Sequence, residues 1–81
     1  MKIVGIKLCS LWDAKHLVQV CEKVSYETDL LWGRYVVDAK SMLGVLSLPQ
    51  FEEAKLQIHS EDCRELLDKL EELGISCVEK S

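Results

Sequence analysis

Hydrophobic and polar residues follow two kinds of spacing along this chain, and the spacing predicts seven secondary-structure elements. Alternation predicts strands over residues 2–9, 34–38 and 54–58, and a further strand is expected over residues 28–32. Spacings of three and four residues predict two long helices, over residues 11–24 and between Ser60 and Gly74, and a short one from Ser41 to Leu46. The predicted element order is therefore βαββαβα.

Polar residues at the helix ends support these boundaries. Ser10 precedes the first helix, and Asp13 follows three residues later in the Ser-x-x-Asp form of a capping box. Ser60 is expected to cap the last helix, whose first turn would then carry Glu61 and Asp62. Gly74 is expected to end that helix, because glycine readily adopts the left-handed conformation.

The fold class follows from burying every apolar stripe in one core. Gly33 supplies a turn between the second and third strands, and Pro49 marks the exit from the short helix. A four-stranded antiparallel sheet with the helices on one face buries all the stripes, which defines an α+β open-faced β-sandwich. The ferredoxin-like βαββαβ fold is the near alternative. The short helix argues against it, whereas an added strand over residues 75–78, in place of a loose tail, would favour it.

Composition and charge narrow the functional classes. The 81 residues are expected to form one domain, 1–81, with 48% hydrophobic and 30% charged residues. The net charge of −4, without a basic stripe, argues against a nucleic-acid partner. No targeting segment or membrane-length apolar run is present, so we expect a cytoplasmic protein with no membrane partner.

The cysteines and histidines are not spaced as a metal site requires. No Cys-x-x-Cys pair occurs and the two histidines are far apart, so no metal or cofactor is expected. Cys21 and Cys63 fall on apolar helix faces, where a cysteine behaves as a small hydrophobe. Cys9 lies next to a helix start and is a candidate nucleophile, but it has no placed histidine base.

The stretch Leu30–Leu48 resembles a known family. Two consecutive segments resemble the centre of the histidine-containing phosphocarrier (HPr) family of the bacterial sugar phosphotransferase system. They are Val-Asp-Ala-Lys-Ser at 37–41 and Met-Leu-Gly-Val-Leu-Ser-Leu at 42–48. The resemblance implies the HPr-like open-faced β-sandwich, in agreement with the predicted element order. It also implies a role for Ser41, because the family's serine at this position caps the second helix and is phosphorylated by a dedicated kinase in many Gram-positive members.

Physical chemistry supports both interpretations of Ser41. A phosphoserine at a helix N-terminus adds roughly −1.5 to −2 charges beside exposed N–H groups, and Lys40 is next in sequence. The alternative is a plain N-cap, worth about 1 kcal/mol. The two interpretations are compatible.

The family's phosphotransfer residue is missing. The family carries a histidine in Gly-x-His-x-Arg-Pro at the start of the first helix, where this chain has Lys-Leu-Cys-Ser-Leu-Trp-Asp at 7–13. Ser10 falls near the active position without replacing a histidine, and Asp13 would repel a phosphate. His16 is expected on the polar surface of the first helix, and His59 has no partner that the sequence identifies. We therefore expect no catalytic residue, no enzyme activity and no histidine phosphotransfer.

The resemblance further implies a docking surface for protein partners. In this chain that surface would include Trp12, Lys40, Met42, Val45 and Leu46. Alternatively, Leu43 and Leu46 pack inward and only Met42 is exposed.

These expectations define the leading hypothesis and its rivals. The leading one is an HPr-like regulatory or adaptor module, controlled at Ser41, whose partners are phosphotransferase-system components, a serine kinase or carbon-source regulators. One rival is an active phosphocarrier that uses an unusual site. The other is a ferredoxin-like module that binds small molecules, for which the sequence holds no motif.

Overall fold

A computed structural model describes residues 1–48 and 53–79 of the chain. Its elements are β1 (Lys2–Lys7), α1 (Leu11–Glu22), β2 (Thr28–Trp32), β3 (Tyr35–Asp38), α2 (Met42–Leu46), β4 (Glu53–Ile58), α3 (Arg64–Glu72) and β5 (Cys77–Glu79). All seven predicted elements are present in the predicted order. The expectation for Pro49 lies outside the described residues.

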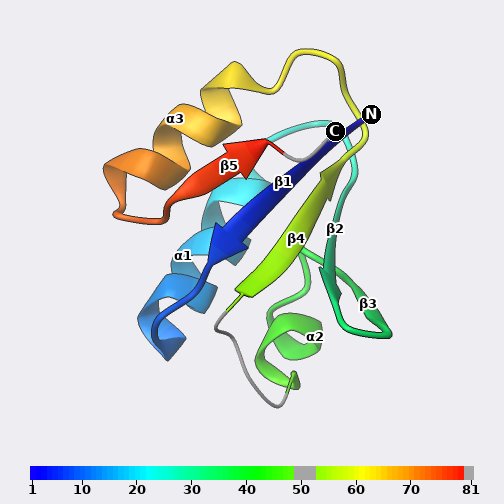
Figure 1. The fold of residues 1–81 in the computed structure, drawn as a ribbon, viewed down its shortest axis with the longest axis vertical. Helices are drawn as coiled ribbons and strands as arrows, with labels where there is room; N and C mark the ends of the chain where they lie inside the picture. Colours follow the sequence, from blue (N-terminus) through cyan, green and yellow to red (C-terminus); the bar gives the residue numbers. More distant parts are fainter. Residues whose placement is uncertain (49–52, 80–81) are drawn as a thin grey trace.

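The sheet has five strands, so the prediction of a four-stranded sheet was wrong. Its order is β3-β2-β4-β1-β5, and every neighbouring pair is antiparallel (Figure 1). The fifth strand forms because α3 ends in a tight turn at Gly74, whose φ is +84°. The N–H of Ile75 then donates to the carbonyl of Leu70 at 2.9 Å, and buried Ile75 starts the chain back along the free edge of β1.

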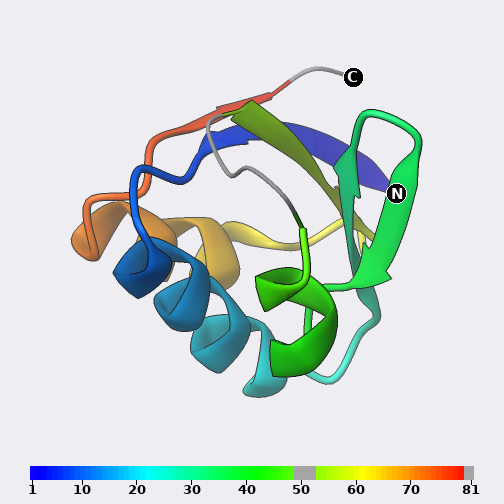
Figure 2. The same cartoon turned by 90° about the horizontal axis from the view of Figure 1, so that it is seen from below.

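The three helices lie on one face of the sheet and leave the other face uncovered (Figure 2). The fold is therefore α+β with two layers, as predicted. Since β1 and β2 are both antiparallel to β4, they run parallel with β4 between them; β4 and β5 likewise run parallel with β1 between them. The sequence-based argument took the short middle helix as evidence against the ferredoxin-like fold and an added tail strand as evidence for it. The structure contains both elements.

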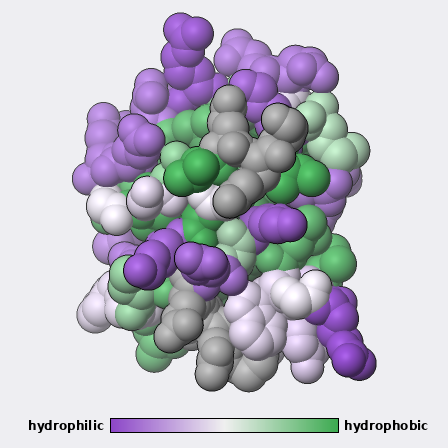
Figure 3. All heavy atoms as spheres, in the orientation of Figure 1, coloured by the Kyte–Doolittle hydropathy of each residue, from purple (hydrophilic) through white to green (hydrophobic). Residues whose placement is uncertain are grey.

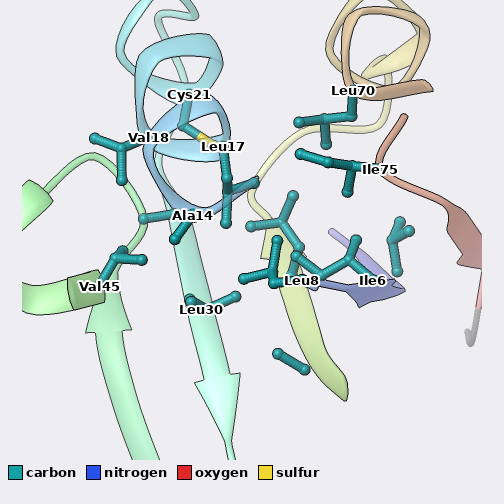
Figure 4. Packing of buried hydrophobic residues seen from close by; sticks show 14 of the residues in the cluster. Ile6, Leu8, Ala14, Leu17, Val18, Cys21, Leu30, Val45, Leu70 and Ile75 are labelled. Carbon is teal, nitrogen blue, oxygen red and sulfur yellow. The ribbon is translucent and has the colours of Figure 1, made fainter. Parts of the chain in front are cut away.

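The core lies between the sheet and the helices, and it follows the predicted apolar stripes (Figure 4). From α1 it takes Ala14, Leu17, Val18 and Cys21; from the three long strands it takes Val4, Ile6, Leu30, Leu56 and Ile58; from α3 it takes Leu66 and Leu70. Alternation along β4 puts Leu56 at 0% exposure between exposed Lys55 and half-buried Gln57.

The start of α3 differs from its prediction. The helix begins at Arg64 with Cys63 in the cap position, so Ser60 is not its N-cap and Glu61 and Asp62 precede it. The Ser60 hydroxyl accepts the N–H of Asp62 at 3.2 Å and so closes a local turn. The Ser60 hydroxyl thus bonds to the backbone of its own turn and not to the first turn of the helix. Glu61 instead accepts the terminal ammonium of Met1 at 3.0 Å, which lowers the pKa of its carboxyl.

Candidate docking surface on helices α1 and α2

Ser41 is the N-cap of α2, as predicted. Its side-chain oxygen accepts the N–H of Gly44 at 3.1 Å, and its carbonyl accepts the N–H of Val45 at 3.0 Å. Gly44 leaves little room, since a Cβ atom there would lie 3.2 Å from the Ser41 hydroxyl oxygen. The hydroxyl is thus held by the first turn of a five-residue helix.

The corner before Ser41 is fixed by Asp38 and Lys40. Asp38 accepts the N–H of Lys40 at its carboxylate and the N–H of Ser41 at its carbonyl, both at 2.9 Å. The Lys40 ammonium donates to the carbonyl of Val24 at 2.9 Å, where it ties α2 to the loop that follows α1. Lys40 is therefore half-buried, and its ammonium is already hydrogen-bonded within the protein.

The side chains of α2 divide differently from both sequence-based alternatives. Val45 is fully buried against α1, beside Ala14 and Val18 (Figure 4), so it provides no docking surface. Leu43, which the second alternative placed inside, is 86% exposed. Met42 is half-buried, and so is Leu46, as parts of the rim of the core. The sequence missed Leu43 because a five-residue helix is too short for its periodicity to identify the buried side.

Trp12 lies at the exposed start of α1. It is 68% exposed, its neighbour Leu11 is 57% exposed, and the Lys15 ammonium sits 5.1 Å from the centre of its ring. On α2 the exposed apolar side chain is Leu43, and the Lys40–Val24 bond ties the start of this helix to the loop after α1. The candidate docking surface thus carries two strongly exposed apolar side chains on different helices, Trp12 on α1 and Leu43 on α2.

The loop before α1 is arranged around Asp13. Its carboxylate accepts the N–H of Cys9 at 2.9 Å, while its own N–H donates to the Ser10 hydroxyl at 3.4 Å. The predicted capping arrangement is confirmed, with the carboxylate bonded one residue earlier than in the usual box. A negative side chain thus already occupies the positive end of α1, where a phosphate would otherwise be favoured.

The two histidines are not placed as the sequence suggested. His16 is half-buried, and its Nδ1 atom is enclosed without a hydrogen-bond partner in the described residues. It lines a groove of 680 Å³ between α1 and α3 together with Tyr26. Burial raises the pKa of the Tyr26 phenol, and the nearby Cys63, Glu65 and Asp62 raise it further.

His59 has a partner that the sequence did not reveal. Its Nε2 atom lies 2.9 Å from a carboxylate oxygen of Asp29, and both side chains are 33% exposed. The pairing of β2 with β4 brings the two residues together, with Thr28 opposite Ile58. Only the strand register, which a single sequence leaves open, would have predicted this contact.

The cysteines are free thiols in distinct surroundings. Cys21 and Cys63 are buried, as predicted, whereas Cys9 is exposed. Burial raises the pKa of Cys21 to about 11 and that of Cys77 to about 11.

Within residues 1–48 and 53–79, no three His, Cys, Asp or Glu side chains are grouped to hold a metal ion. No helix in this part of the chain has the length and apolar character needed to cross a membrane.

The sequence matches no family model, and no curated protein matches it.

Proposed function

We propose that this chain is an HPr-like regulatory or adaptor module of the sugar phosphotransferase system. In this proposal it docks protein partners through α2, responds to phosphorylation at Ser41 and carries out no histidine phosphotransfer. The observation that carries the proposal is the side chain of Leu43. It is 86% exposed two residues after the Ser41 cap, whereas Val45 on the same short helix is fully buried. Single exposed leucines are common, but this one stands beside a modifiable hydroxyl.

Phosphorylation at Ser41 would change this surface by charge. A phosphate there adds roughly −1.5 to −2 charges next to the N–H groups of the first turn of α2. The Lys40 ammonium is held at Val24, so it gives limited compensation. An apolar partner on Leu43 would then have to displace water from this anion, so we expect phosphorylation to weaken the binding of such a partner and to strengthen the binding of a cationic one.

The direct test is binding to phosphotransferase-system proteins and carbon-source regulators, measured by biolayer interferometry. We would compare the unmodified protein, the Ser41-phosphorylated protein and a Leu43→Asp variant. The matched control is Val36→Asp on β3, because Val36 is 66% exposed on the uncovered face of the sheet. We expect Leu43→Asp to abolish binding and Val36→Asp to preserve it. If neither form of Ser41 binds any of these proteins, the proposal is wrong.

The absence of phosphotransfer has its own test. We expect no label on the protein after incubation with labelled phosphoenolpyruvate and the general phosphate donor enzyme. The carboxylate of Asp13 at the start of α1 supports this expectation. An acid-labile, base-stable phosphate on His16 or His59 would instead establish an active phosphocarrier.

A second candidate function is a module that binds small molecules, as expected for the ferredoxin-like alternative. Two features of the sheet favour it. The tail forms strand β5, and β1 runs parallel to β2, and β4 to β5, with one antiparallel strand between the members of each pair. This function predicts that a small ligand raises the thermal unfolding midpoint. Its readout is a response to a small ligand, whereas the first candidate is tested by protein binding, so the two candidates are separable.

A further inference from the structure

A row of open-face residues crosses the whole sheet. The strand register aligns Val36, Leu31, Lys55, Gly5 and Val78 from β3 to β5. Gly5 has no side chain, so the row is interrupted between Lys55 and Val78 near the middle of the sheet. A glycine inside a strand is typical of a place where a ligand or another backbone comes close.

This interruption forms the floor of a groove of 590 Å³. Leu31 and Val78 are its apolar walls, and Val78 is 55% exposed. Viewed onto this face, Figure 3 shows hydrophobic and hydrophilic residues side by side over the part of the sheet that is coloured. The volume lies within the range of small-molecule sites, roughly 300–1,000 Å³.

The charges at the groove favour an anion. Lys7 and Lys55 both line it, and neither makes an ion pair or a side-chain hydrogen bond in the described residues. Glu53, opposite Lys7 in the β1–β4 ladder, is the one carboxylate among the lining residues that the structure describes. These described lining residues thus carry one net positive charge in a chain whose total is −4. The chain places unpaired lysines beside apolar walls at this groove.

We infer that this groove binds a small organic monoanion, a carboxylate on an apolar body. The carboxylate would lie between the ammonium groups of Lys7 and Lys55, and the apolar body would cover Gly5 between Leu31 and Val78. A single negative charge matches the net charge of the lining, whereas a phosphate dianion exceeds it. The N–H groups of central strands are largely used in the ladders, so recognition of the anion falls to the two lysines. This inference rests on the second proposed function and is independent of the first.

The test uses octanoate as the probe and amide NMR shifts as the readout. We expect octanoate to shift the amides of Gly5, Leu31 and Val78 and to raise the thermal midpoint. Octanamide, which has the same apolar body without the charge, is expected to bind about tenfold more weakly, because charge-assisted hydrogen bonds are the stronger ones. Inorganic phosphate alone is expected to leave these amides unchanged.

Matched variants locate the site. Lys55→Gln is expected to weaken octanoate binding about tenfold. Lys15→Gln removes a partly exposed lysine of α1 that does not line the groove, and it is expected to leave binding unchanged. Both positions are on the surface, so both variants should give well-dispersed amide spectra. Leu31→Ala, which shortens an apolar wall, should weaken octanoate and octanamide alike.

Three results would overturn the inference. Equal affinity for octanoate and octanamide would show that the two lysines do not recognise the charge. Octanoate-induced amide shifts confined to the α1–α3 groove would show that the ligand binds there and not on the open face. Concentration-dependent shifts on this face without any ligand would show that a second copy of the chain covers it. If octanoate has no effect but another small molecule raises the thermal midpoint, the second proposed function stands and the ligand class assigned here is wrong.

Discussion

Leu56 and Lys55 are neighbours in β4, yet they stand on opposite faces of the sheet and have opposite surroundings. Leu56 faces the helices and is fully buried, whereas Lys55 lies on the open face beside Gly5 and has no ion-pair partner in the described residues. The covered face is constrained by packing, so each of its residues is accounted for by the fold. The open face carries residues that the fold does not require, and these are the better guide to function.

The largest expected effect tests this contrast within one strand. Leu56→Ala should lower the free energy of unfolding by about 2–5 kcal/mol, because it leaves a cavity between β4 and the helices. Lys55→Ala should change it by less than about 0.5 kcal/mol. Urea denaturation followed by circular dichroism measures both. Similar losses in the two variants would mean that the open face is covered in solution.

The next effect concerns the pH dependence of the covered face. Burial raises the pKa of the Cys21 thiol from 9.0 to about 11, because the folded state disfavours the thiolate. The resulting stability is fully present below pH 9 and is lost as the pH rises through about 11. The loss should reach about 2–3 kcal/mol.

Urea midpoints at pH 8 and about pH 11 measure this loss, and Cys21→Ala provides the comparison. That variant should be less stable than the parent at pH 8 and should lack this part of the alkaline decline. Cys9→Ala, which removes an exposed thiol, should leave the decline unchanged. An equal alkaline decline in the parent and in Cys21→Ala would contradict the burial argument.

The covered face is also what the sequence predicted best. Residues such as Leu17, Leu56 and Leu66 repeat at strand or helix spacing, and that repeat reports burial directly. The sequence does not decide between a strand and a loose end for β5, because three residues carry too little pattern to distinguish the two. The edge of β1 decides its conformation, and that edge is distant in the sequence.

The candidate sites were predicted less well, for related reasons. Ser41 was found because a capping serine acts on residues three positions away. Val45 is buried because α1 packs against it, and the ammonium of Lys40 is hydrogen-bonded because the carbonyl of Val24 lies within reach. His59 meets Asp29 because of the strand register. All three are contacts between distant segments. The open-face groove was missed because the residues that line it come from four strands, β1, β2, β4 and β5.

A third prediction compares two serines that were both expected to cap helices. Ser41→Ala should cost about 1 kcal/mol of stability, since it leaves the N–H of Gly44 without its partner. Ser60→Ala should cost less than about 0.5 kcal/mol, because Ser60 closes an exposed turn outside α3. Thermal and urea unfolding distinguish the two. A larger loss for Ser60→Ala would mean that α3 begins earlier in solution than in this structure.

The smallest expected effect belongs to the open face. Asp29 follows buried Thr28 in β2 and so points away from the helices; it pairs with His59 and also stands opposite Asp38 in the β2–β3 ladder. Asp29→Asn removes an attraction that solvent already screens and a repulsion between two cross-strand carboxylates. The free energy of unfolding should therefore change by less than about 0.5 kcal/mol, and by less still in about 1 M salt, where the Debye length is about 3 Å. Urea denaturation at low and high salt measures the change. If Asp29→Asn lowers the free energy of unfolding by more than about 1 kcal/mol at high salt, the Asp29–His59 pair is buried beneath a partner. The open face would then be a covered surface in solution, and its contrast with the helix-covered face would fail.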